Sequence, residues 1–91
     1  MIKSKKHKLK GDAISRSVFL DGEYLSPAES QIVCNHSPDG FSWGYGGSGA
    51  AQLALAIILK LTTKHEGYQV FKWRVIAKLP QEKSFEIEFE L

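Results

Sequence analysis

The chain lacks the cysteine pairs that cross-link secreted domains and the long apolar runs that span membranes. Cys34 is the single cysteine among 91 residues, which excludes an intrachain disulfide and a zinc site built from several cysteines. The longest apolar run, residues 50–61, contains Gln52 and Lys60 and is shorter than the roughly 18 residues that a membrane-spanning helix needs. No apolar segment follows the basic start, so no secretory signal is recognised. These absences predict a cytoplasmic protein.

Residue types that commonly act in catalysis are also few, and their spacing does not suit a catalytic site. His36, Ser37 and Asp39 contain the letters of a nucleophilic triad, but they are crowded into one turn and cannot adopt the relay geometry. Cys34 and His36 are two potential metal ligands without obvious partners. We therefore predict no catalytic residue, no metal and no cofactor, and we expect a protein that is not an enzyme.

The charge is unevenly distributed. The chain has a net charge of +2, yet residues 1–10 carry five lysines and no acid, whereas residues 11–91 carry seven basic and ten acidic residues. This asymmetry predicts a basic, disordered tail over residues 1–10 and a single domain over residues 11–91. Such a tail can contact nucleic-acid phosphates without sequence specificity; the alternative is a solvated terminus.

Short strands are expected in the first half of the domain. Residues 14–20 are rich in β-branched and aromatic side chains and end at Asp21-Gly22, a hairpin dipeptide. Residues 23–25 begin the return strand, and Pro27 interrupts it because proline cannot donate to a ladder. A third short strand is expected over residues 30–34.

Helices are expected in the second half. Residues 50–63 are apolar on nearly all sides, which indicates a buried helix with Ser48 as its N-cap. Residues 65–67 read as a break, and an apolar stripe from Tyr68 predicts an amphipathic helix ended by Pro80. Three basic residues fall largely off that stripe: Lys72, Arg74 and Lys78. They either extend a basic surface from the N-terminal tail or form a solvated helix face.

The last strand completes the fold class. Residues 85–91 alternate apolar and acidic side chains, which is the period of a strand with one buried face. Together the elements predict an α+β protein: a small antiparallel sheet of three to four strands with two consecutive helices packed on one face.

The loop before the first long helix is the most distinctive segment. Four of the eight glycines fall between Gly44 and Gly49, and they match the G-x-G-x-x-G pattern of phosphate-binding turns at a helix start. A dinucleotide fold would need a parallel strand after the helix, where a second helix is expected instead. A P-loop needs lysine and Ser or Thr where Ala50 and Ala51 stand. Both nucleotide-binding patterns therefore fail.

Two interpretations of this loop remain open. In one, the loop amides and the helix start hold a phosphate, carboxylate or nucleotide, aromatic side chains stack on a base or sugar, and His36 polarises the anion. In the other, the glycines allow tight packing against the sheet and the aromatics belong to the core or its rim. The candidate ligand-binding residues are Asn35, His36, Trp43, Tyr45, Gly46, Gly47, Ser48 and Gly49.

A longer motif supports a resemblance to a known family. Residues 35–49 read NHSPDGFSWGYGGSG and residues 51–56 read AQLALA, with further matches at Tyr68-Gln69 and Phe71-Lys72. In this motif the chain resembles a widespread, uncharacterised family of small proteins, a domain of unknown function in bacterial and phage genomes. The resemblance covers roughly residues 11–80 and implies a mobile-element context but no activity or substrate. Ala50 stands where the family usually has proline.

The leading hypothesis is a small non-enzymatic binding module with an anion or nucleotide site at the glycine-rich loop and helix N-terminus. The alternative is a protein-interaction module, phage- or mobile-element-encoded and directed at a host factor, that uses Trp43, Tyr45 or the sheet edge. A weaker alternative is non-specific nucleic-acid binding through the lysine-rich N-terminus. No membrane partner is expected, and the sequence leaves the oligomeric state open.

Overall fold

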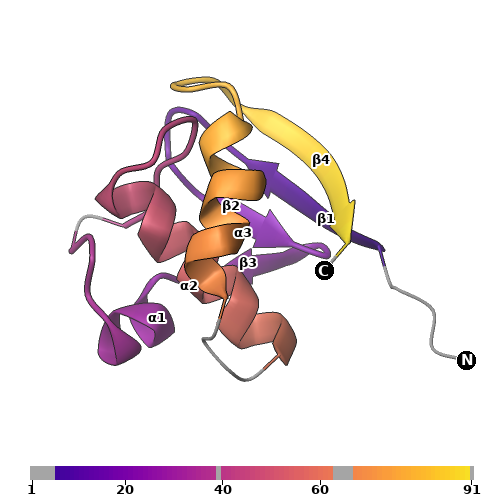
Figure 1. Ribbon diagram of the computed structural model, residues 1–91. Helices are drawn as coiled ribbons and strands as arrows, with labels where there is room; N and C mark the ends of the chain where they lie inside the picture. Colours follow the sequence, from indigo (N-terminus) through magenta and orange to yellow (C-terminus); the bar gives the residue numbers. More distant parts are fainter. Residues whose placement is uncertain (1–5, 39, 63–66, 91) are drawn as a thin grey trace, which may run out of the picture.

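Four antiparallel strands form one sheet in the computed structural model, which describes residues 6–38, 40–62 and 67–90. The strands are β1 (Lys6–Gly11), β2 (Val18–Leu20), β3 (Glu23–Leu25) and β4 (Phe85–Glu90). Their order is β3-β2-β1-β4, so the first and last strands of the chain lie side by side (Figure 1). The predicted antiparallel sheet is confirmed.

The helical segments lie on one side of this sheet (Figure 1). They are α1 (Ala28–Val33), α2 (Ser48–Thr62), α3 (Tyr68–Arg74) and the 3-10 turn η1 (Ile76–Lys78). Every residue of α2 from Gly49 to Ile58 is buried, as expected for a helix enclosed between a sheet and other helices. The predicted α+β class is therefore confirmed, with α1 as an additional helix. No described helix is long and apolar enough to cross a membrane.

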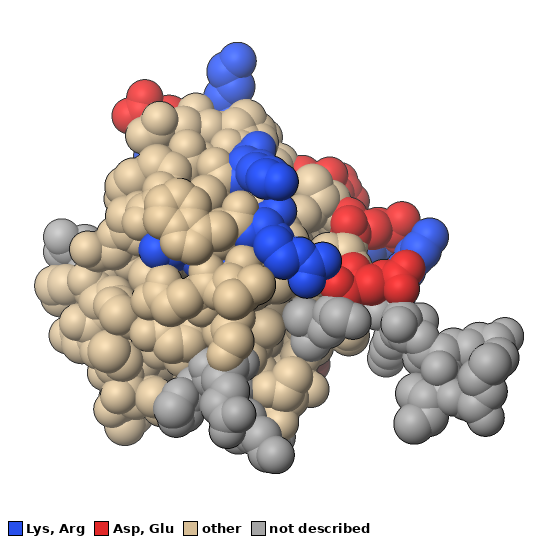
Figure 2. Space-filling view, in the orientation of Figure 1, with Lys and Arg blue, Asp and Glu red and all other residues tan. Residues whose placement is uncertain are grey.

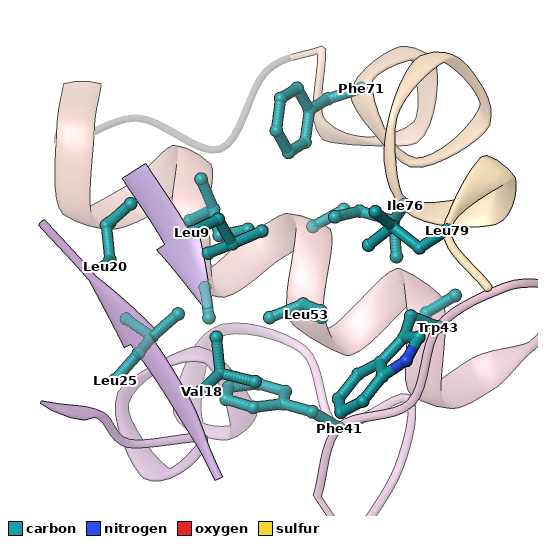
Figure 3. Close-up of a cluster of buried hydrophobic side chains, with 14 of the residues drawn as sticks. Leu9, Val18, Leu20, Leu25, Phe41, Trp43, Leu53, Phe71, Ile76 and Leu79 are labelled. Carbon is teal, nitrogen blue, oxygen red and sulfur yellow. The ribbon is translucent and has the colours of Figure 1, made fainter. Parts of the chain in front are cut away.

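The core lies between α2 and the sheet. Figure 3 shows Leu53 of α2 among side chains from the strands, from η1 and from the loop that precedes α2. Leu53, Leu9, Val18 and Ile76 are fully buried, and burial of each such side chain contributes about 1.5–3 kcal/mol. The core therefore holds the start of α2, and the loop before it, against the sheet.

The β2–β3 connection forms at the predicted dipeptide. Asp21 and Gly22 both have positive φ, 53° and 85°, as a two-residue hairpin turn requires. The strand predicted over residues 14–20 is shorter than expected and begins at Val18. Residues 13–15 instead form a turn, because the Asp12 carboxylate accepts the backbone N–H groups of Ile14 and Ser15 at 2.8 and 3.0 Å.

The strand predicted over residues 30–34 is wrong, because α1 occupies most of this segment. Pro27 precedes the helix with a right-handed helical conformation, φ −71° and ψ −17°, which suits a helix start. Ser30 Oγ donates to the Pro27 carbonyl at 2.8 Å, and the Ser30 carbonyl accepts the Cys34 N–H at 2.9 Å. The β-branched pair at residues 32 and 33 is mostly exposed, so local helix signals decide the outcome.

The tail predicted over residues 1–10 is also corrected. Residues 6–10 belong to β1, which pairs with both β2 and β4 and places Leu9 fully inside the core. Residues 1–5 lie outside the described residues. The lysines of β1 are therefore part of the sheet, and the register sets each one opposite a glutamate of β4: Lys6 with Glu90, Lys8 with Glu88 and Lys10 with Glu86.

The amphipathic helix predicted from Tyr68 to Pro80 is interrupted. The chain leaves helical geometry at Val75, where φ is −121° and ψ is −60°, and continues as η1. Residues 65 and 66 of the predicted break lie outside the described residues. So does Thr63, the last residue of the helix predicted over residues 50–63. Gly67, which is described, has a φ of 81° directly before α3.

Candidate functional site

Trp43 is a core residue and cannot serve as an open stacking platform. Its side chain is fully buried, and it points into the cluster of core side chains (Figure 3). Trp43 Nε1 donates to the Lys83 carbonyl at 2.9 Å, and its ring meets Phe85 edge-on with centroids 4.9 Å apart. The Arg16 guanidinium lies 5.1 Å from the ring centroid. Trp43 therefore packs in the core, as the second interpretation of the loop expects.

Two aromatic rings lie directly on the glycine loop. A Cβ atom at Gly46 would overlap the six-membered ring of Trp73, and one at Gly47 would overlap the ring of Tyr45. Glycine at both positions therefore allows these rings to lie directly against the loop, and a larger residue would displace them. Tyr45 and Trp73 remain 40% and 58% exposed, so both rings also present a surface to solvent.

The backbone N–H groups of residues 46–49, unlike the Cα atoms of the glycines there, are not engaged by other parts of the described chain. Within residues 6–38, 40–62 and 67–90, no hydrogen bond engages the N–H groups of residues 46–49. The first internal bond of the helix start is donated by Ala51 to the Gly47 carbonyl at 3.0 Å. Ser48 is the first residue of α2 and is exposed, whereas Gly49 is buried. These amides form the positive end of the helix dipole.

Lys72 is the basic residue nearest to this loop, and it is nearly buried, at 7% exposure. Its Nζ donates to the Gly46 carbonyl at 3.2 Å and lies 4.4 Å from the Trp73 ring centroid. None of the described carboxylates forms an ion pair with it. An ammonium group has three donors, and burial without an opposite charge is unfavourable. The loop therefore combines unpaired amides with an uncompensated cation.

The prediction that Lys72 lies on a solvated helix face is wrong. Lys72 is four residues after Tyr68 and four before Ile76, and all three face the buried side of this segment. Residues four apart lie on one face of a helix, so the spacing was a usable signal. The apolar stripe predicted from Tyr68 does not include Lys72. Trp73 was missed as well, because no pattern in the sequence places it on Gly46.

His36 lies near the other end of α3. His36 Nε2 and the Tyr68 hydroxyl are 2.7 Å apart, and the two ring centroids are 5.7 Å apart. Tyr68 and Lys72 are separated by one helical turn, about 5.4 Å along the axis. His36 therefore contacts α3 on the same face as Lys72, but its imidazole is occupied by the phenol rather than directed at the glycine loop.

Gln52 holds the segment that contains His36 against α2. Its side chain is fully buried; Oε1 accepts the backbone N–H groups of His36 and Ser37 at 2.7 and 2.9 Å, and Nε2 donates to Ser30 Oγ and the Cys34 carbonyl at 2.8 and 3.1 Å. One amide thereby satisfies four groups. A lone polar residue in an apolar helix was the signal that could have found it.

The candidate residues thus divide into three groups. Tyr45, Gly46, Gly47, Ser48 and Gly49 come together at the start of α2, with Lys72 and Trp73 beside them. Asn35 is exposed on the segment that Gln52 anchors, and His36 bonds Tyr68. Trp43 lies in the core. Of the predicted site, the structure therefore brings together only residues 45–49.

Charge is segregated on the face of the molecule that carries α3. Figure 2 shows Lys and Arg side chains over the centre of this face, where Figure 1 places α3, and Asp and Glu side chains along β4 to the right. The segment formed by α3 and η1 contains three basic residues and no acidic one. In the described part of the chain, no three His, Cys, Asp or Glu side chains are grouped as metal ligands. An anion is the charge type that this face favours.

The chain was compared with protein families, curated proteins and solved structures. A model of a family of unknown function (DUF6166) matches residues 6–90. No curated protein and no solved structure matches the chain. The matched range includes β1 and β4, so the family unit is longer than the resemblance over residues 11–80 indicated, and it coincides with the complete sheet. The chain therefore belongs to this family of unknown function.

Proposed function

We propose that this protein is a non-enzymatic binding module that takes a phosphate- or carboxylate-bearing ligand at the start of α2. The observation that carries the proposal is Lys72: its ammonium is nearly buried beside the glycine loop and has the Gly46 carbonyl as its hydrogen-bond acceptor within the described residues. An anion bound there would accept charge-assisted hydrogen bonds, which are stronger than neutral ones.

The loop amides support the same ligand chemistry. The N–H groups of residues 46–49 have no acceptor among the described residues, and a helix N-terminus favours negative charge by about 0.3–1 kcal/mol at exposed sites. Tyr45 and Trp73 flank the amides with exposed rings. These rings replace Trp43 as the side chains available for stacking on a nucleotide base or sugar.

The proposal is tested by measuring binding of inorganic phosphate, pyrophosphate and AMP by calorimetry and thermal shift. A probe at about 100 times its dissociation constant adds about 2.7 kcal/mol to the free energy of unfolding, which raises the Tm of a domain of this size by about 10–20 °C. Lys72→Met keeps the apolar stem and removes the charge, so affinity should fall at least about tenfold, since hydrogen bonds to charged groups contribute about 1.5–3 kcal/mol.

Lys78→Met is the matched control, because Lys78 is exposed on η1 in the same segment. It should leave the affinity within about twofold, as expected for a solvent-exposed charge that salt screens. The proposal is refuted if none of the three probes binds the wild type, or if Lys72→Met binds them as tightly as Lys78→Met does.

A protein-interaction module is the second candidate. The observation that favours it is a set of exposed apolar side chains on α3 and the adjoining loop: Val70 at 60%, Trp73 at 58% and Tyr45 at 40%. With Trp43 buried, Trp73 takes its place as an anchor, and aromatic anchors dominate protein interfaces. In a complex of this kind Trp73→Ser would abolish partner binding, whereas Lys72→Met would have a smaller effect. Origin from a phage or mobile element and a host-factor target stay predictions, as does a cytoplasmic location.

Nucleic-acid binding through the N-terminal lysines is disfavoured by the fold. Three of the five lysines lie in β1, each opposite a glutamate of β4. A phosphodiester backbone approaching these lysines would also meet the adjacent carboxylates. Lys3 and Lys5 lie outside the described residues.

A further inference from the structure

The face of the sheet that points away from the helices carries an ordered row of side chains. The strand register aligns one residue from each strand across the sheet: Glu86 of β4, Lys10 of β1, Phe19 of β2 and Tyr24 of β3. All four alternate with buried neighbours such as Leu9, so they project to the opposite side from the core. In Figure 1 the helices lie on the other side of the sheet.

The apolar half of this row is an exposed aromatic pair. Phe19 is 40% exposed and Tyr24 is 59% exposed. Their ring centroids are 5.8 Å apart with an edge-to-face angle of 69°, so the two rings form one ridge. A shallow hollow adjoins it and is lined by Lys8, Lys10, Phe19, Gly22 and Glu86. A ridge beside a hollow is a shape that can fit a second copy of itself.

The charges on this face identify the occupant. Three lysines of β1 and three glutamates of β4 form two neighbouring columns of opposite sign, so the two columns together are neutral. A nucleic acid presents one sign and would be repelled by the glutamate column. The row has a charged half, Lys10 and Glu86, and an aromatic half, Phe19 and Tyr24. A partner that presents the same two halves in reverse order is complementary to it, and a second copy of this chain supplies it.

A two-fold axis produces the required match. An axis that runs parallel to the strands and passes between β1 and β2 reverses the order of the row in the second copy. Lys10 then faces Phe19 of the other copy, which is a cation–π arrangement, and Glu86 faces the hydroxyl of the other copy's Tyr24, which can donate to it. Every residue of the row thereby meets a partner of suitable chemistry, as in an isologous interface.

We infer that the open face of the sheet is a self-association surface, through which two copies pack face to face with Phe19 and Lys10 at the centre and Tyr24 and Glu86 at the rim. The face is small, roughly 19 Å wide across four strands at about 4.8 Å spacing. The area that it can bury is therefore smaller than that of a standard stable interface. The dimer is therefore weak and reversible.

Sedimentation equilibrium of the full chain, from micromolar to millimolar protein, tests this inference. A monomer–dimer equilibrium is expected. Phe19→Ser and Lys10→Glu should each raise the dimer dissociation constant at least tenfold, while Lys10→Arg, which keeps the cation, should leave it within about threefold. Matched controls away from this face are Val70→Ser and Lys78→Glu, which should associate like the wild type. Circular dichroism establishes that each variant is folded.

Isotope-filtered NOEs between labelled and unlabelled copies give a second readout. Contacts between Lys10 and Phe19 of different copies are expected. A monomer at millimolar protein overturns the inference, as does a dimer that Phe19→Ser and Lys10→Glu leave unchanged. Shifts of the Phe19 and Tyr24 signals on adding single-stranded oligonucleotide to a monomeric protein would assign the face to nucleic acid instead. These outcomes are separate from phosphate binding at Lys72, which lies on the helical side of the molecule.

Discussion

Replacing Gln52 with leucine should destabilise the fold more than its conservative volume suggests. The substitution removes the amide that accepts the backbone N–H groups of His36 and Ser37 at 2.7 and 2.9 Å and that donates to Ser30 and Cys34. The His36 N–H also donates to the Cys34 carbonyl at 3.2 Å, so these two groups keep a partner in the variant. The Ser37 N–H has no other acceptor among the described residues, and an unpaired N–H in a half-buried residue costs about 1–3 kcal/mol.

The expected loss is about 1–3 kcal/mol from a total stability of about 5–15 kcal/mol. For a domain of this size the corresponding fall in Tm is about 5–25 °C. Urea denaturation should show a lower midpoint with an unchanged slope, and hydrogen exchange should accelerate at the amides of His36 and Ser37. Gln69→Leu on the exposed side of α3 is the control and should change stability by less than about 0.5 kcal/mol. A Gln52→Leu variant as stable as wild type would refute this reasoning.

Two further predictions follow from the loops. Gly46→Ala forces the Trp73 ring to move and should shift tryptophan fluorescence. Because this ring is 58% exposed and can turn toward solvent, the free energy of unfolding should fall by no more than about 1 kcal/mol; unchanged emission would contradict the close approach. The backbone N–H groups of Ser15, then Ile14, lower the pKa of the Asp12 carboxyl, so its stabilisation is complete above the unfolded-state pKa of about 3.9 and is lost as pH falls through the lower folded-state pKa. Wild type should then lose its stability margin over Asp12→Ala on acidification through that range, whereas a constant margin would contradict this linkage.

Elements with a strong local signal were predictable. The alternation of apolar and acidic residues over residues 85–90 predicts β4, the Asp21-Gly22 dipeptide predicts the hairpin, and the apolar run from residue 50 predicts α2. In each case the local pattern and the tertiary environment favour the same structure. The α+β class and the helix-on-sheet layering follow from these three elements.

Where local and tertiary preferences differed, the predictions failed. Leu9 is the one strongly apolar residue of β1, too little for a periodic signal, and pairing with two neighbouring strands makes this segment a strand. In α1 the β-branched residues 32 and 33 suggested a strand, yet the Pro27 start and the Ser30 bonds produce a helical turn. Neither outcome is visible in a single window of sequence.

The sequence predicts where the candidate site lies, but not which side chains surround it. Glycines at 44, 46, 47 and 49 before an apolar helix are enough to predict a close-approach loop at a helix start, because glycine is tolerated where backbone and neighbouring groups meet closely. Which groups meet them is a three-dimensional matter: Trp73 lies on Gly46 and Tyr45 lies on Gly47. The contact of Trp73 with Gly46 joins segments that are well separated in the chain, whereas Tyr45 is only two residues from Gly47.

Local residue patterns are enough to predict the class of fold, the hairpin, the buried helix and the position of the glycine loop, because each depends on the conformational preferences of neighbouring residues. Long-range packing places Trp43 in the core, buries Lys72 beside the loop and sets the β1 lysines opposite the β4 glutamates. Burial and charge pairing depend on segments far apart in the chain, so their outcome exists only once the sheet and helices have packed.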